Sequence, residues 1–95
     1  MKEAAIQAKI IKYLKQSGAY VIKTVITNRN GVPDIIACLN GIFLGLEVKN
    51  ESGKMTELQK WNIEAIGNAG GISACVRNID DVKKIVEKIG ASNDR

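Results

Sequence analysis

The residues Asp34-Ile-Ile-Ala-Cys-Leu-Asn-Gly-Ile-Phe-Leu-Gly-Leu-Glu-Val-Lys49 decide the fold, because they encode a β-hairpin. Asn40-Gly41 separates two apolar runs, and Asn-Gly is the preferred pair for a type I′ turn, which needs positive φ at both central positions. The predicted strands, 34–39 and 42–48, are apolar at almost every position. We therefore expect them in the middle of a sheet, covered on both faces.

The hairpin places two acids opposite each other. A two-residue turn pairs Leu39 with Ile42, and counting outward brings Asp34 opposite Glu47. Directly opposed side chains have Cβ atoms about 5 Å apart. Two carboxylates at that separation, among apolar neighbours, repel each other unless a proton or a cation lies between them. Lys49 follows Glu47 by two residues and so projects from the same face of the strand.

Two acids and one amine suit a hard divalent cation with oxygen ligands, and this favours Mg²⁺ or Mn²⁺. Each residue also has a simpler interpretation. Asp34 follows Pro33 and fits a turn, whereas Glu47 and Lys49 fit a solvated strand end. A β-bulge in the hairpin would shift the register and separate the acids.

The rest of the chain reads as alternating helices and strands. The predicted elements are a helix at 2–17 ended by Gly18, a strand at 20–25, a loop at 27–33, a helix at 56–69 begun by Thr56, a strand at 72–77, and a helix from Asn78 to Gly90, with a frayed tail at 91–95. The order is α-β-β-β-α-β-α. Helix 56–69 can form a right-handed crossover, which predicts an α/β fold with a mixed four-stranded sheet flanked by helices.

Bulk properties limit the function classes. The 95 residues form one domain at 1–95, and a net charge of +4 permits a polyanionic partner without requiring one. The chain has no histidine, which excludes a Ser-His-Asp system within one chain and argues against zinc. Cys38 and Cys75 lie in apolar runs, which predicts buried thiols and a cytoplasmic protein. No apolar run is long enough to predict a membrane span.

Two short motifs resemble a nuclease signature. Gly31-Val-Pro-Asp34 followed by Leu46-Glu-Val-Lys49 resembles the PD-(D/E)XK pattern. The resemblance extends to the VRR-NUC branch, in its short stand-alone form found in phages, through Glu3, Gln7, Gly53-Lys54 and Gln59. It covers nearly the whole chain and implies a restriction-endonuclease-like core, similar to that of Holliday-junction resolvases.

This resemblance implies a metal-dependent DNA endonuclease. Asp34 and Glu47 would bind Mg²⁺ or Mn²⁺, and the backbone carbonyl of Val48 would complete the metal shell. Lys49 would orient or deprotonate the attacking water, or stabilise developing negative charge. The resemblance also implies a homodimer. No segment looks like a base-reading helix, so we expect selectivity for branched DNA over selectivity for sequence.

Several residues carry two interpretations. Glu3 is a further metal ligand by resemblance, or an exposed acid that favours the helix dipole. Gln59 is a catalytic-site residue, or part of a Thr56-x-x-Gln59 capping box. Gln7 is a site residue or an ordinary surface glutamine, and Trp61 belongs to the core or to a dimer interface. The predicted phosphate contacts, each also readable as a solvated charge, are Lys23, Arg29, Lys54 and Lys60.

The main alternative function is a non-catalytic nucleic-acid-binding module that keeps a nuclease fold. Opposed acids near phosphates offer nothing to a pure binder, so the acid–acid–lysine set favours the enzyme. A third possibility is a small interaction domain in which the acids bind Mg²⁺ or stay exposed.

Overall fold

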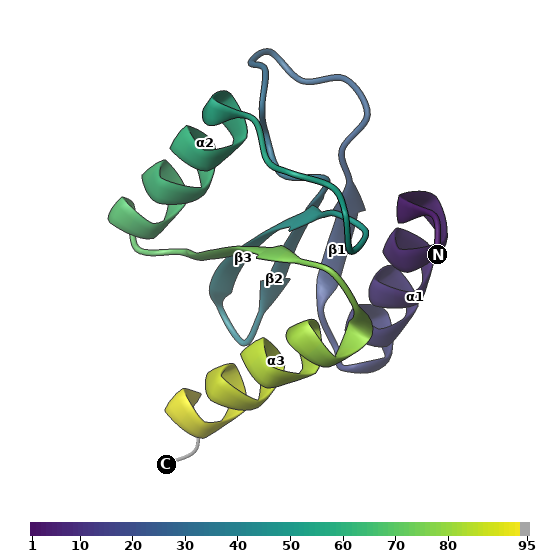
Figure 1. The fold of residues 1–95 in the computed structure, drawn as a ribbon. Helices are drawn as coiled ribbons and strands as arrows, with labels where there is room; N and C mark the ends of the chain where they lie inside the picture. The colour runs from purple at the N-terminus through teal and green to yellow at the C-terminus, as the bar shows by residue number, and fades with distance from the viewer. Residues whose placement is uncertain (94–95) are drawn as a thin grey trace.

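The computed structural model describes residues 1–93, with side chains through residue 90, and its elements follow the predicted order (Figure 1). They are α1 (Glu3–Gln16), β1 (Tyr20–Lys23), β2 (Ile35–Leu39), β3 (Ile42–Val48), α2 (Glu57–Asn68), β4 (Ile72–Val76) and α3 (Ile79–Asn93). The strands form one sheet in the order β1-β2-β3-β4. The first three strands are antiparallel, and β4 runs parallel to β3 after the α2 crossover. The α/β class and the mixed four-stranded sheet are confirmed.

The predicted hairpin register is confirmed. Asn40 and Gly41 have φ values of 53° and 80°, as a type I′ turn requires. The ladder runs without interruption from the pair Leu39 and Ile42 to the pair Ile35 and Leu46. Asp34 therefore lies one residue before β2 begins.

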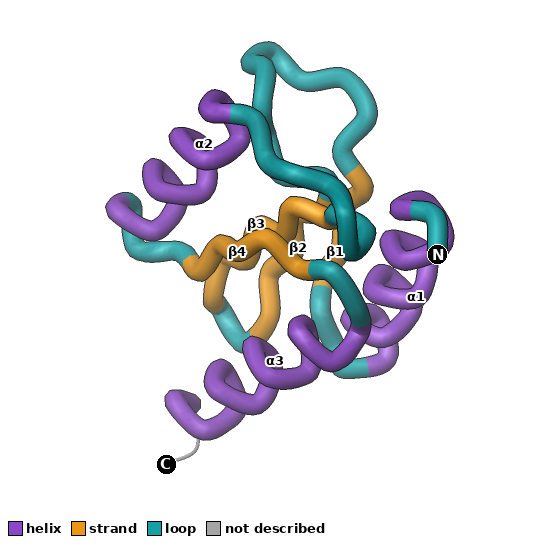
Figure 2. Tube along the Cα trace, in the orientation of Figure 1, coloured by secondary structure: helices purple, strands orange, loops and turns teal. Residues whose placement is uncertain are grey.

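The main core lies between one face of the sheet and the helices α1 and α3, while α2 packs on the opposite face (Figures 1 and 2). Alternation along β2 and β3 sends one set of side chains into this core. The buried apolar residues are Ile6, Ile10, Leu14, Ile35, Ala37, Leu39, Leu44, Leu46, Val48, Val76, Val82 and Ile89. Glu47 points the other way, toward the face that α2 partly covers.

The face under α2 is only half covered, which corrects two predictions. The contacts of α2 are with β3 and β4, because a single crossover helix spans about two strands. At the uncovered end, Tyr20 is 71% exposed, and Ile22 and Phe43 are 46% and 44% exposed. The prediction that both hairpin strands are covered on both faces is wrong for β2. The predicted burial of Cys38 is also wrong, since it is exposed, and Cys75 is half-buried.

The inner side of α2 is partly polar. Trp61 is 56% exposed, so the core alternative is wrong, and the dimer-interface alternative stays a prediction. The buried residue is Asn62, whose Nδ2 donates to the carbonyls of Asn30 and Leu58. A Cβ at Gly31, whose φ is 81°, would come within 2.8 Å of a Leu58 side-chain atom. The loop before β2 therefore packs tightly against α2 at Leu58 and Asn62.

The C-terminal helix is longer than predicted. The prediction that Gly90 ends the helix is wrong, because α3 continues to Asn93. Gly90 does not adopt positive φ, and a glycine inside a helix costs only about 1 kcal/mol relative to alanine. Of the predicted frayed tail, residues 94–95 lie outside the described part of the chain. Within residues 1–93, no helix combines the length and apolar character needed to cross a membrane.

Candidate active site

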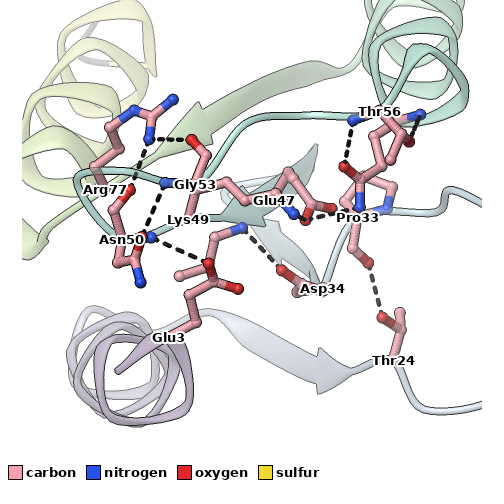
Figure 3. Close-up of polar contacts among 12 residues, drawn as sticks. Glu3, Thr24, Pro33, Asp34, Glu47, Lys49, Asn50, Gly53, Thr56 and Arg77 are labelled. Carbon is pink, nitrogen blue, oxygen red and sulfur yellow. Dashed lines mark hydrogen bonds and ion pairs between the residues drawn. The ribbon is translucent and has the colours of Figure 1, made fainter. Parts of the chain in front are cut away.

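Asp34 is held at the start of β2 by backbone contacts on both sides (Figure 3). Its Oδ2 accepts a hydrogen bond from the backbone N–H of Val48 at 2.9 Å. Its own carbonyl accepts from the backbone N–H of Thr24 at 2.9 Å, which extends the β1–β2 pairing by one residue. One side-chain oxygen is thus fixed on the neighbouring strand, and the carboxylate is oriented toward Glu47.

Glu47 is an almost fully buried carboxylate, since it is only 2% exposed. Its Oε2 accepts from Gln59 Nε2 at 3.2 Å and lies 3.5 Å from Lys49 Nζ. Its Oε1 is buried and has no hydrogen-bond partner in the described structure. A buried, unpaired carboxylate oxygen is costly, so this atom marks the position where a cation or a proton would be stabilised.

Burial shifts the ionisation of Glu47. Desolvation, with the nearby Asp34 carboxylate as the next cause, raises the pKa of Glu47 from 4.5 to about 7. The Lys49 amine acts in the opposite direction and lowers this pKa, but it does not compensate. Near neutral pH the metal-free site is therefore divided between a protonated and an ionised Glu47.

This shift predicts how stability depends on pH when metal is absent. Between about pH 4.5 and pH 7 the folded protein keeps a proton on Glu47 that the unfolded chain has released. The free energy of unfolding should therefore fall as pH rises through this window, by about 3 kcal/mol in total, and level off above it. Denaturant unfolding in the presence of a chelator measures the change. Glu47→Gln should remove this component, and an unchanged pH slope in that variant would contradict the assignment.

Lys49 lies beside Glu47, as strand parity predicted. Its side chain is 15% exposed, and its amine is the positive group closest to the Glu47 carboxylate that the structure records. Its backbone N–H donates to the carbonyl of Val76, so β4 extends the β3 pairing up to this residue. The structure thus brings Asp34, Glu47 and Lys49 together.

Gln59 forms the predicted cap and also contacts Glu47. Its backbone N–H donates to Thr56 Oγ1 and its Oε1 accepts from the Thr56 N–H, which completes the capping box of α2. Its Nε2 is left free to donate to Glu47 Oε2. The cap therefore fixes the amide with its donor end toward the acid. Helix start and site geometry are set by the same side chain.

Glu3 lies at the edge of the site, where it contacts the loop after β3. Its Oε2 accepts from the backbone N–H of Asn50 at 3.3 Å, in the loop that follows β3 (Figure 3). Across the described residues, no group of three or more acidic, cysteine or histidine side chains is placed to hold a metal ion. The structure joins Glu3 to the loop at 50–53 and leaves its role as a metal ligand as a prediction. Gln7, on the same helix, is half-buried.

Two residues near the site were not predicted from the sequence. Arg77, just after β4, donates through Nη1 to the carbonyls of Asn50 and Gly53, both at 2.7 Å. Asn50 Oδ1 accepts from the backbone N–H groups of Ser52 and Gly53 and closes the loop from within. Asn50 in a polar loop is a recognisable signal for such a turn. Arg77 carries no comparable signal, because its contact depends on the parallel pairing of β3 and β4.

The predicted basic residues are all exposed, and Arg29 lines a hollow that also includes Asp34. Lys60 pairs with Glu57 at 3.4 Å, and the Arg29 guanidinium lies 5.9 Å from the Trp61 ring centre. Lys23 and Lys54 are exposed on β1 and on the loop before α2. A hollow of about 350 Å³ adjoins Asp34 and is lined mainly by the loop at 24–32. The site thus opens onto a polar hollow that includes one arginine.

Comparisons with known proteins agree with this geometry. The family model described as archaeal Holliday junction resolvase (Hjc) matches residues 2–69, a span that contains Asp34, Glu47, Lys49 and Gln59. A solved structure titled "VRR_NUC domain" is 26% identical, with a TM-score of 0.77, and the match covers 90% of this chain and 94% of that one. Another, "VRR_NUC domain protein", is 19% identical with a TM-score of 0.75 over 93% and 87% of the two chains, and shows the same fold. No curated protein matches the chain.

The family match covers well over half of the chain, and the fold agrees over nearly all of it. The predicted restriction-endonuclease-like core and the VRR-NUC resemblance are confirmed. The chain belongs to the archaeal Holliday junction resolvase family, and its fold is similar to that of solved VRR-NUC domains.

Proposed function

We propose that this protein is a DNA endonuclease that depends on Mg²⁺ or Mn²⁺ and cuts branched DNA in preference to linear duplex. One observation carries the proposal. Glu47 presents a buried oxygen without a partner beside the Asp34 carboxylate and the Lys49 amine. A stable protein has little reason to keep such an arrangement unless the unpaired oxygen binds something.

The residues present fit a divalent cation. Carboxylate oxygens are the ligands that Mg²⁺ and Mn²⁺ prefer, and a cation would neutralise the repulsion that raises the pKa of Glu47. We assign Asp34, Glu47 and the Val48 carbonyl as ligands, with Glu3 as a candidate fourth. When bound, the metal would lower the pKa of a coordinated water and polarise the scissile phosphate.

The chain's own residues would then position and charge the reaction centre. Lys49 places a positive charge where negative charge develops on the phosphate, or holds the attacking water. Gln59 fixes the orientation of the Glu47 carboxylate through Oε2, so that Oε1 stays directed at the cation. Phosphate contacts by the exposed cations would hold the DNA backbone across the site. These are Lys23, Arg29, Lys54 and Lys60.

Two features support the finer parts of the proposal. The family is named for Holliday junction resolution, and a four-way junction needs two cuts, which a homodimer with two sites would supply. The uncovered sheet face of β1 to β3 exposes Tyr20, Ile22, Cys38 and Phe43. A contiguous apolar patch of this kind is typical of an interface, and we propose that it contacts a second copy of the chain.

A cleavage assay on a substrate panel tests the proposal. Four-way junction, flap, splayed and linear duplex DNA of equal length are incubated with the protein and Mg²⁺, Mn²⁺ or a chelator. We expect cleavage only with metal, and branched DNA cut roughly tenfold faster than linear duplex, as for a preference of about 1.4 kcal/mol. Tight binding without cleavage of any substrate would instead favour the non-catalytic binding module.

A further inference from the structure

The loop between β1 and β2, residues 24–34, carries an exposed apolar tip formed by Val25 and Ile26. Val25 is 84% exposed and Ile26 is 92% exposed, the two highest values among the large apolar side chains of the described residues. They are consecutive, and in Figure 1 this loop projects from the sheet on the side of the α2 N-terminus. Two adjacent β-branched side chains in water are unfavourable in the free protein, so their position calls for a partner.

The tip is anchored beside the proposed site. Thr24, the residue before Val25, donates its backbone N–H to the Asp34 carbonyl and its hydroxyl to the Pro33 carbonyl. The far arm of the loop is held where Asn62 donates to the Asn30 carbonyl. Thr27 Oγ1 donates to the Arg29 carbonyl and closes the turn between the arms. The apolar pair thus keeps a defined relation to the residue assigned as a metal ligand.

The surroundings of the tip favour nucleic acid as its partner. The hollow of about 350 Å³ is lined by Val25, Ile26 and Asp34 together. Exposed Arg29 lines the same hollow, whereas Lys23 pairs with the buried Ile35 and so projects from the opposite face of the sheet. A partner that fits must offer negative charge to Arg29 and an apolar face to the tip. A DNA strand with an unstacked base offers both, through its phosphates and its base planes.

We propose that Val25 and Ile26 form a wedge that packs against an unstacked base step at a DNA branch point and directs the adjoining phosphate toward Asp34. Aliphatic side chains are used in this way by proteins that open base steps. A branch point already has weakened stacking, so the wedge would act at little energetic cost there and at a high cost in linear duplex. This inference rests on the proposed endonuclease function and names the element that selects the DNA structure.

The test compares two double variants at the same positions. Val25→Thr with Ile26→Thr removes the apolar character of the tip and keeps its β-branched shape. Val25→Ile with Ile26→Val exchanges the two side chains and keeps both the apolar character and the shape. Both sites are exposed, so both variants should unfold at the wild-type temperature. We expect the threonine variant to cut a four-way junction about tenfold more slowly and linear duplex at the wild-type rate, as for the loss of about 1.4 kcal/mol of branch-specific interaction. The exchange variant should behave as wild type.

Fluorescence of 2-aminopurine at the branch point gives a readout independent of cleavage. In a Lys49→Met background, binding should raise the fluorescence, because the base unstacks, and the threonine substitutions should abolish the rise. Unchanged branch preference and unchanged fluorescence in the threonine variant would overturn the wedge, even though wild type cuts DNA. A loss of dimer in that variant, measured without DNA by sedimentation, would assign the tip to a second copy instead. Absence of cleavage by wild type would count against the proposed function itself.

Discussion

Glu47→Gln is expected to lower DNA cleavage by about a thousandfold while the fold is retained. The substitution keeps the size of the side chain and its contact with Gln59, but it removes the negative charge that the unpaired Oε1 would offer to a cation. Loss of a group that stabilises charge at a reacting centre costs this order of magnitude. Single-turnover cleavage of the preferred branched substrate, at saturating Mn²⁺, measures the effect.

Glu57→Gln is the matched control for this variant. Glu57 lies on α2, two residues before Gln59, but its side chain is 93% exposed and pairs with Lys60 on the surface. It should cut DNA at close to the wild-type rate. Thermal unfolding gives a second readout, since Mn²⁺ should raise the melting temperature of wild type and of Glu57→Gln, but not of Glu47→Gln. Wild-type cleavage by Glu47→Gln would remove this residue from the proposed mechanism.

Lys49→Met is expected to lower the cleavage rate by about a hundredfold and to leave DNA binding within a few-fold of wild type. Methionine keeps the apolar stem of the side chain but removes the amine that lies 3.5 Å from Glu47 Oε2. Positioned groups that move a proton or stabilise charge contribute effects of this size. Rates at saturating DNA, together with dissociation constants from fluorescence anisotropy in a chelator, separate the chemical step from binding.

The control for this variant is Lys84→Met, an exposed lysine on α3. The helix α3 packs on the core with α1 and β4, away from the face that holds Glu47. Lys84→Met should match wild type in both rate and affinity. If Lys49→Met weakened DNA binding as much as it slowed cleavage, Lys49 would be a phosphate contact and its proposed role in the chemical step would be wrong.

Local sequence determined the register of the central hairpin, the faces of its side chains and the start of α2. Asn40-Gly41 sets a two-residue turn, and a two-residue turn allows one register, so the pairing from Leu39 and Ile42 outward followed directly. Strand parity then placed Lys49 on the face of Glu47. The capping box at Thr56 and Gln59 was likewise a short-range pattern. In each case the interaction joins residues whose spacing along the chain fixes their geometry.

Contacts between distant segments were decided by the tertiary structure. Whether Cys38 is covered depends on how far α2 extends across the sheet, and whether Trp61 is covered depends on which side of α2 packs against the rest of the fold. No local pattern contains that information. The same holds for Arg77, which reaches the loop at 50–53 only because β4 pairs parallel to β3.

Gln59 and Glu3 show most clearly what local sequence determines and what tertiary contacts decide. For Gln59 the sequence supported a cap and a site residue equally. The fold forms the cap and adds a contact with Glu47, because the cap leaves the amide donor of Gln59 facing this acid. For Glu3 the fold supplied a partner in the loop after β3 that lies 47 residues away. The sequence alone determined the register that opposes two acids. Only the tertiary structure decided which of their oxygens would be buried without a partner, because burial depends on packing from every side.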